Sequence, residues 1–165
     1  MQVRHADFDA CLSLPFTVLG VRIRDHALTH LEFLPLGTPS RASGDVLVAD
    51  LAAQLQAYLA DPAHRFDLPF EWHGTPFRQR VWQALMRIPV GETRTYGDIA
   101  RQLDSSPRAV GQALGDNPLP IVVPCHRVVS SAGLGGFNHH ASGAAIEIKR
   151  WLLEHEGVRL GTCPR

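Results

Sequence analysis

Three helix-start signals constrain the second half of the chain to short helices. Each is a hydroxyl residue whose side-chain oxygen can accept a hydrogen bond from a free N–H of the first helical turn. They are Thr75, Thr95 and Ser106. Proline follows the first and third of them, at a helical position where a missing N–H costs nothing. Asp98 stands where it completes a capping box with Thr95. The pattern predicts three short helices between residues 75 and 115.

The apolar residues that follow these signals have helical spacing. The first predicted helix buries one apolar face, and Pro89 and Gly91 stop it. That face comprises Phe77, Val81, Leu85 and Ile88. The third helix runs from Ser106 through Leu114. The second and third helices, joined by a tight turn, resemble a helix-turn-helix. Many helix pairs share this spacing, so the pair alone does not establish DNA binding.

The first half of the chain predicts a small sheet and one helix. Residues 18–23 and 28–34 are rich in β-branched residues or alternate apolar with polar ones, as β-strands do. A turn predicted at residues 25–26 separates them. Residues 46–60 carry an apolar stripe at helical spacing, and the proline that follows closes this helix.

Length and charge limit what kind of protein this is. A chain of 165 residues with 45% hydrophobic residues can fill one core or that of two small domains. We predict an N-terminal α/β domain over residues 1–70, a second domain over 75–160 and a tail over 161–165. Lys and Arg together number 16, as do Asp and Glu, so the chain lacks the basic excess of many nucleic-acid binders. Any DNA contact must come from a local patch.

The cysteines predict neither a disulfide framework nor a zinc site. Cys11, Cys125 and Cys163 are odd in number and far apart, and none belongs to a Cys-x-x-Cys motif. A zinc site built from Cys11, His26 and His30 is the alternative, but their spacing matches no zinc motif. We therefore predict no metal.

The start of the chain and its hydropathy indicate a cytoplasmic protein. Residues 1–10 lack the basic start and apolar run of a signal peptide. No stretch approaches the roughly 18 uninterrupted apolar residues of a membrane span. We expect a reduced, cytoplasmic location without membrane association.

Cys125 is the candidate nucleophile. An apolar run at residues 121–123 predicts a short strand, and Pro124 ends its hydrogen bonding directly before the cysteine. A cysteine reacts as the thiolate, which needs a nearby base or positive field. His126 is adjacent, but neighbouring side chains on an extended backbone point to opposite faces. His126 can therefore act on Cys125 only if the chain turns or a water bridges the two.

Residues 124–128, Pro-Cys-His-Arg-Val, resemble the active-site motif of the O6-alkylguanine-DNA alkyltransferases, also called methylated-DNA–protein-cysteine methyltransferases. The likeness covers about residues 75–160 in the family's order and near its spacing, whereas residues 1–70 fit the family only in outline. Several separate motifs carry it, and together they are far more specific than one. They are Tyr96-Gly97, Arg108-Ala109-Val110-Gly111, Asn117-Pro118 and Lys149-Arg150-Trp151-Leu152-Leu153-Glu154-His155-Glu156.

The resemblance implies a fold and an activity. The fold is an α/β N-terminal domain with a small RNase H-like sheet, followed by a mainly helical domain with a winged-helix-like helix-turn-helix. The activity is that of a methylated-DNA–[protein]-cysteine S-methyltransferase. It moves the alkyl group of O6-alkylguanine, and of O4-alkylthymine, irreversibly to Cys125, once per molecule. The implied partner is double-stranded DNA, bound through its minor groove with little sequence preference and with base flipping. A monomer without a cofactor is expected.

The resemblance also implies catalytic and DNA-binding roles. Cys125 is the acceptor thiol, His126 takes its proton through a bound water, and Glu156 orients His126 and stabilises its charge, as in a catalytic triad. Arg108 enters the duplex and fills the space left by the flipped guanine. Tyr96 rotates the nucleotide by crowding its 3′ phosphate.

Further residues receive roles from the same resemblance. Asn117 would brace the turn between the third predicted helix and the active-site strand. The DNA contacts are Ala109, Gly111 and Gln112, together with Arg108 and Tyr96. The substrate-pocket residues are Tyr96, Val128, Phe137, Asn138 and Ser142.

The pocket loop departs from the family pattern. The family has a short Gly-Tyr-Ser/Ala-Gly-Gly stretch, whereas residues 136–143 of this chain form a longer loop with Phe137 near the usual tyrosine. Either Asn138 or Ser142 would contact the base. We interpret the double histidine at the loop tip as solvent-exposed filler; the alternatives are an accidental metal-binding pair and a DNA contact. Such a loop is expected to be mobile before DNA binds and to border the alkyl pocket.

Two other functions compete with this interpretation. A cysteine hydrolase using Cys125, His126 and Glu156 would turn over many times, which irreversible transfer forbids. A lesion sensor of the alkyltransferase-like type would flip the base without reacting, but such proteins lack the acceptor cysteine that this chain has. For the partner of His126, Glu154 is the alternative to Glu156.

Overall fold

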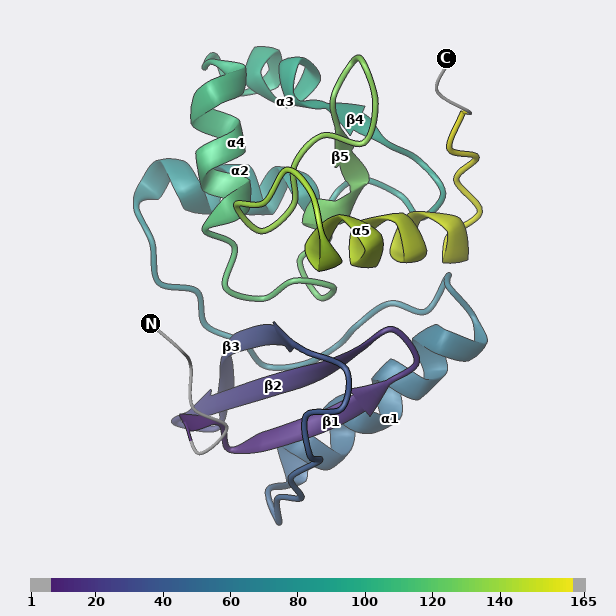
Figure 1. The fold of residues 1–165 in the computed structure, drawn as a ribbon. Coiled ribbons are helices and arrows are strands. Elements are labelled where there is room, and N and C mark those ends of the chain that lie inside the picture. The colour runs from purple at the N-terminus through teal and green to yellow at the C-terminus, as the bar shows by residue number, and fades with distance from the viewer. Residues whose placement is uncertain (1–6, 162–165) are drawn as a thin grey trace. The chain divides into compact units, whose positions relative to one another are not determined.

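A computed structural model describes residues 7–161, in which the chain forms two compact units, residues 1–73 and 74–165 (Figure 1). Cys163 and nearly all of the predicted tail at 161–165 lie outside the described residues. The first unit contains a three-stranded antiparallel sheet and one helix, and the second contains the remaining helices. The protein is thus a small α/β protein.

The sheet of the first unit consists of β1 (Ala10–Leu14), β2 (Thr17–Arg24) and β3 (Ala27–Leu34) in that order. The sequence predicted the second and third strands but missed β1. Asp25 and His26 connect β2 to β3 with φ angles of 50° and 63°. Such left-handed residues form tight hairpin turns whose twist matches the flanking strands. The predicted turn at 25–26 is confirmed.

Helix α1 (Val46–Ala60) lies alongside the sheet in the first unit (Figure 1). Its N-cap Asp45 accepts a hydrogen bond from the N–H of Leu47 at 2.8 Å. The apolar stripe predicted from Val46 to Leu59 is only partly correct, because Val46 is 83% exposed and Leu59 is half-buried. The buried residues nevertheless have helical spacing. They are Leu47, Val48, Leu51, Leu55 and Tyr58.

The second unit begins with α2 (Pro76–Leu85), β4 (Arg94–Thr95), α3 (Tyr96–Gln102) and α4 (Pro107–Gly115). All three predicted N-caps accept a hydrogen bond from a first-turn N–H, and the capping box of α3 has both of its bonds. The indole N–H of Trp82 on α2 donates to the carbonyl of Ala113 on α4 at 2.8 Å. This buried bond fixes the position of α4.

Helix α2 ends at Leu85, although its apolar face was predicted to continue to Ile88. The chain turns after Leu85, and Ile88 is nevertheless buried, at 4% exposure. Its side chain thus belongs to the core without belonging to the helix.

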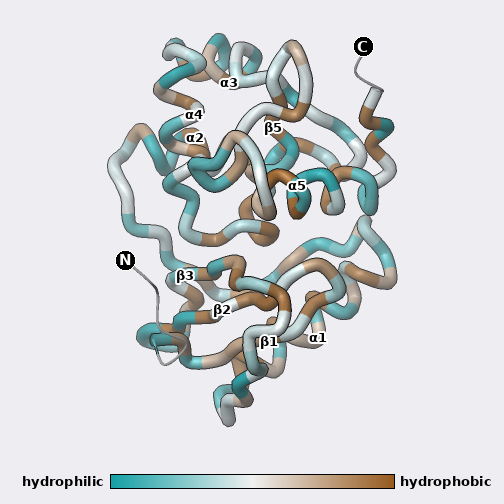
Figure 2. The backbone as a smooth tube through the Cα atoms, viewed as in Figure 1, coloured by the Kyte–Doolittle hydropathy of each residue, from teal (hydrophilic) through white to brown (hydrophobic). Residues whose placement is uncertain are grey.

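The chain then forms a 3₁₀ turn, η2 (Cys125–Arg127), β5 (Val128–Val129) and α5 (Ala144–His155). Strand β5 pairs in parallel with β4, so Val128 lies opposite Arg94. Along α5, hydrophobic and hydrophilic residues alternate (Figure 2). Within residues 7–161, none of the helices is both long and hydrophobic enough to cross a bilayer.

The strand predicted at residues 121–123 is wrong. These residues form a turn in which Ile121 has φ 74°, and only Val123 makes a single bridge, to Pro120. The N–H of Val123 donates to the carbonyl of Leu119 at 2.8 Å, so the chain coils back on itself. The run is apolar because the core buries it from all sides. Three apolar residues cannot by themselves distinguish such a turn from a strand.

Candidate active site

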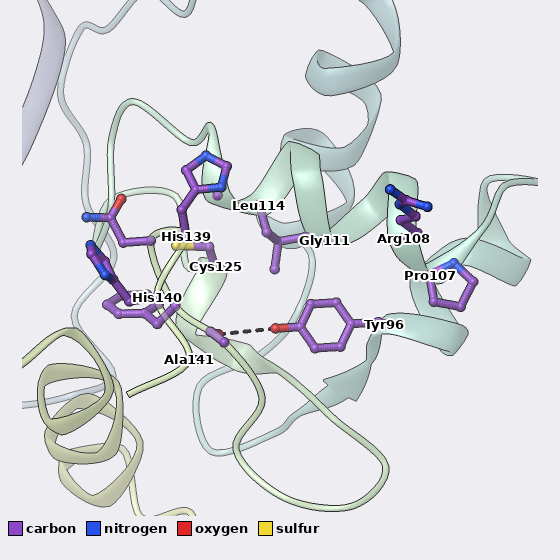
Figure 3. A pocket seen from close by; sticks show the side chains of 13 residues that line it. Tyr96, Pro107, Arg108, Gly111, Leu114, Cys125, His139, His140 and Ala141 are labelled. Carbon is purple, nitrogen blue, oxygen red and sulfur yellow. Dashed lines mark hydrogen bonds between the residues drawn. The ribbon is translucent and has the colours of Figure 1, made fainter. Parts of the chain in front are cut away.

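A cavity of about 500 Å³ lies between α3, α4, the 3₁₀ turn and the loop after β5 (Figure 3). Cys125 lies in its wall, together with Tyr96 of α3 and Gly111 of α4. Residues 136–141 of the loop form another wall, and Arg108 lies at the opposite end of the cavity. The structure therefore gathers side chains from four separated segments around one thiol.

The thiol of Cys125 is 4% exposed, and burial raises its pKa. Three influences oppose this rise: a hydrogen bond with the Asn117 side chain, the positive charge of Lys149, and the backbone N–H groups of Cys125 and His126. All of them favour the thiolate, because each brings a donor or a positive charge to the sulfur. The site thus shields the sulfur from water, and the hydrogen-bond donors and the Lys149 charge offset part of the cost of forming the thiolate there.

Asn117 holds the turn that presents Cys125. Its Nδ2 donates to the carbonyl of Val123 at 2.9 Å, and its Oδ1 accepts from the N–H of Leu119 at 3.0 Å. Because Asn117 follows the C-terminus of α4, these bonds join that helix to the 3₁₀ turn. The resemblance implied that Asn117 braces the turn before an active-site strand, whereas here it binds a turn, because residues 121–123 form no strand.

The chain turns at Cys125, and this turn carries His126 inward to Glu156. Nε2 of His126 lies 2.8 Å from Oε1 of Glu156, and the side chains are 1% and 0% exposed. A carboxylate only accepts hydrogen bonds, so Nε2 carries the proton and the lone pair of the neutral ring lies on Nδ1. Nδ1 is buried and has no hydrogen-bond partner in the described part of the chain. It is therefore the nitrogen that can serve as a base.

Arg127 holds the other edge of Glu156. Its Nε donates to Oε2 at 2.9 Å and its Nη2 to Oε1 at 3.0 Å, while its Nη1 donates to the carbonyl of Ile88 at 2.6 Å. Burial alone raises the pKa of Glu156, but the hydrogen bonds from His126 and Arg127 outweigh it and lower the pKa to about 2. Burial lowers the pKa of His126 against the opposing influence of Glu156. The pair consequently holds a neutral imidazole beside a carboxylate.

Lys149 of α5 is fully buried. Its Nζ donates to the carbonyl of Val128 at 2.6 Å and to that of Gly136 at 2.9 Å. The Tyr96 hydroxyl donates to the same Gly136 carbonyl at 3.1 Å (Figure 3). Burial lowers the pKa of Lys149 to about 8, partly offset by the charge of Cys125. One carbonyl thus ties the pocket loop to α3 and α5.

The structure does not bring every predicted site residue to the cavity. Tyr96, Arg108 and Gly111 line it, as do Phe137 and Asn138 of the loop.

Val128, Ser142, Ala109 and Gln112 are not among the lining residues. The Val128 side chain is fully buried and its carbonyl accepts a hydrogen bond from Lys149, so a contact of that carbonyl with the base would use its second lone pair. Gln112 is exposed on α4. No group of three metal-binding side chains occurs within residues 7–161.

Comparison with known proteins places this arrangement in a family. A family model for the DNA-binding domain of 6-O-methylguanine DNA methyltransferase matches residues 76–158, half of the chain. A methylated-DNA–protein-cysteine methyltransferase of Mycolicibacterium paratuberculosis is 40% identical over 149 residues, which cover 86% of this chain and 87% of the relative. The chain belongs to the 6-O-methylguanine DNA methyltransferase family.

Other members are similar over different lengths. A Mycobacterium bovis methylated-DNA–protein-cysteine methyltransferase is 50% identical over 109 residues, and this chain spans 63% of its length. The crystal structure of the Mycobacterium tuberculosis protein OGT in complex with DNA superposes with a TM-score of 0.73 at 39% identity, covering 89% of this chain and 91% of that one. The similarity of fold thus extends into the first unit.

Two residues of this site were not singled out from the sequence. Arg127 was named only as part of the active-site motif, and no local sequence pattern indicates that its guanidinium binds the Glu156 carboxylate. Lys149 does leave a signal. It falls on the apolar stripe of α5 with Ile146 and Leu153, where a charged residue is seldom buried without partners. A lysine on such a stripe indicates a buried, hydrogen-bonded cation.

Proposed function

We propose that this protein repairs DNA by moving an alkyl group from O6-alkylguanine, or O4-alkylthymine, to Sγ of Cys125. The observation that carries this proposal is the thiol in the wall of a cavity, next to a neutral histidine whose Nδ1 is unpartnered and whose Nε2 is bound to a buried carboxylate. Curated relatives named methylated-DNA–protein-cysteine methyltransferases support it.

His126 and Glu156 activate the thiol in this mechanism. Nδ1 of His126 takes the Cys125 proton through a bridging water, and Glu156 stabilises the positive charge that the imidazole gains. The thiolate sulfur attacks the alkyl carbon, and the C–S bond forms as the bond from that carbon to O6 breaks. Guanine leaves with the electron pair and takes up a proton. The thioether is stable, so each molecule acts once.

The DNA interface is formed by α3 and α4, acting as a helix-turn-helix in a winged-helix-like unit. Arg108, exposed in the first turn of α4, enters the duplex, and Tyr96 rotates the target nucleotide. Ala109, Gly111 and Gln112 face the sugar-phosphate backbone. We propose binding through the minor groove with little sequence preference, by a monomer in the cytoplasm. The first unit would be the RNase H-like domain.

The decisive experiment weighs the intact protein after reaction with duplex DNA containing O6-methylguanine. We expect a mass gain of one methylene per molecule, with no further product after one equivalent, and peptide mapping should place it on Cys125. The Cys11→Ala variant serves as the control, because Cys11 belongs to the first unit and is not among the residues that line this cavity. Methylation at another residue, or many turnovers per molecule, would contradict the proposal and favour a hydrolase.

Arg108→Ala is expected to slow repair in duplex DNA roughly 100-fold while changing the reaction with free O6-benzylguanine little. Extruding a base costs a few kcal/mol, and a side chain that fills the gap recovers part of this cost. The free base needs no extrusion. Arg87→Ala, which removes an exposed arginine to which no DNA contact is assigned, is the matched control. Comparing single-turnover rates on both substrates measures the effect. Equal losses on both would show that Arg108 does not stabilise a flipped base.

A further inference from the structure

Three side chains tie the tip of the pocket loop to two helices of the second unit, and we call them the latch: His139, Asp116 and Arg78. Nε2 of His139 lies 2.8 Å from Oδ1 of Asp116, and Nη2 of Arg78 lies 2.5 Å from Oδ2 of Asp116. Asp116 is the C-cap of α4, and Arg78 lies in the first turn of α2. The double histidine was interpreted from the sequence as solvent filler, and the latch gives one of the two a defined partner.

The His139 ring also packs against the backbone at the end of α4. A Cβ atom added to Gly115 would lie 2.3 Å from Cε1 and 2.4 Å from Nδ1 of that ring. Real atoms do not approach so closely. The ring therefore occupies the space that a side chain at position 115 would need, and the glycine permits this contact.

The backbone at the loop tip has a defined shape. Phe137 and His140 exchange two N–H···O bonds of 2.8 Å, and the two residues between them, Asn138 and His139, have φ angles of 51° and 62°. Left-handed backbone is unfavourable for residues with a side chain, although asparagine tolerates it better than most. The latch supplies contacts that hold His139 in this conformation.

The latched turn forms part of the cavity that contains the acceptor thiol. Asn138, His139 and Gly115 all line that cavity together with Cys125. In Figure 3, His139 and His140 lie on one side of the pocket and Arg108 on the other. The latch thus fixes one wall of the space into which an alkyl group must fit.

We propose that His139, held by the latch, limits the size of the alkyl group that reaches Cys125. This inference rests on the proposed alkyl transfer. A methyl group needs little room, so a fixed wall leaves its transfer unimpeded. A benzyl group needs room for a ring, and a packed wall yields only if the His139 ring leaves Gly115 and the turn moves. His139 is therefore a specificity-determining residue, and Asp116 is its positioning residue.

The test compares single-turnover rates for O6-benzylguanine and O6-methylguanine placed in the same duplex. We expect His139→Ala to raise the ratio of the benzyl rate to the methyl rate roughly tenfold, because pocket changes of a few carbon atoms alter discrimination to this extent. Asp116→Asn, which keeps the shape of the side chain but removes its charge, should raise the ratio in the same direction by less. Duplex affinity should change little in both variants.

Gly115→Ala is a second, independent test of the proposal. Its added methyl group displaces the His139 ring, although none of the three latch residues is itself substituted. We expect Gly115→Ala alone to raise the ratio. Combined with His139→Ala it should add little, because the ring that it displaces is already absent. Additive effects of the two changes would overturn the proposal.

His140→Ala is the matched control. It removes a second imidazole from the same cavity wall, but the structure of residues 7–161 shows no hydrogen bond from this ring to α4. An unchanged ratio in His139→Ala with Cys125 still alkylated, or an equal rise in His140→Ala, would refute the role of the latch. Failure of the unmodified protein to alkylate Cys125 at all would instead refute the proposed function. Circular dichroism of each variant checks its fold, and Asp116→Asn tests the latch if His139→Ala does not fold.

Discussion

Cys125→Ser is expected to abolish methyl transfer while leaving DNA binding intact. A serine hydroxyl holds its proton far more tightly than a thiol, and its oxygen is a weaker nucleophile toward saturated carbon. The neutral His126 cannot make up this difference. The hydroxyl is smaller than the thiol and can still bond with Asn117, whose side chain contacts Cys125 now. The fold and the cavity should therefore persist.

Two measurements check this expectation. Transfer of labelled methyl from O6-methylguanine duplex to the protein should fall below detection in Cys125→Ser. Affinity of the same variant for that duplex should remain within a few-fold of the unmodified protein, because the exposed Arg108 and the surface of α4 are unaltered. Residual transfer to the variant would mean that another nucleophile accepts the alkyl group.

Local signals explain why the helices of the second unit could be predicted. The cap of α3 needs only Thr95 and Asp98, three residues apart, and both bonds of the box form as the sequence indicates. The cap of α4 needs only Ser106 and the N–H of Ala109. Each interaction is decided within one helical turn, so a pattern in the sequence is sufficient.

The strand predicted at residues 121–123 does not form, because a contact with a residue outside this run sets the conformation of the backbone. The Asn117 side chain binds Val123 six residues away, and this bond bends the chain before Cys125. The apolar residues of this run correctly predict that it is buried, but they do not predict its backbone conformation. Periodicity distinguishes a strand only over a longer run.

The catalytic residues show the same difference between features set by sequence neighbours and features set by distant residues. Cys125 and His126 could be singled out from the residues themselves, but Glu156 was identified only through the family resemblance, because 30 residues separate the histidine from the carboxylate and no periodic pattern links them. Composition predicts that a glutamate near the end of a helix is exposed, as Glu154 is. Only the structure shows that the Glu156 side chain is fully buried and that it accepts hydrogen bonds from His126 and Arg127.

Glu156→Gln is expected to lower the methyl-transfer rate roughly 100-fold and to destabilise the fold by about 3 kcal/mol. The neutral amide cannot stabilise the charge that His126 gains when it takes the thiol proton. It also offers one acceptor oxygen where the carboxylate offers two. Arg127, whose side chain is 15% exposed, then keeps a largely buried guanidinium without its counter-charge. Removing one partner of such a pair costs more than replacing both. Glu154→Gln, an exposed change two residues earlier, should alter neither quantity.

The pH dependence of stability separates the electrostatic part of this loss from a packing defect. The pKa of Glu156 is lowered in the fold from 4.5 to about 2, so the charged carboxylate stabilises the protein fully above pH 4.5. That stabilisation is lost as the pH falls through the folded value, because the native carboxylate then takes up a proton too. The gap in unfolding free energy between the unmodified protein and Glu156→Gln should therefore narrow as the pH falls from 4.5 toward 2. Denaturant titrations across that range measure it. A gap that stays constant would mean that the variant loses packing instead of charge, and the assignment of Glu156 as the electrostatic partner of His126 would be wrong.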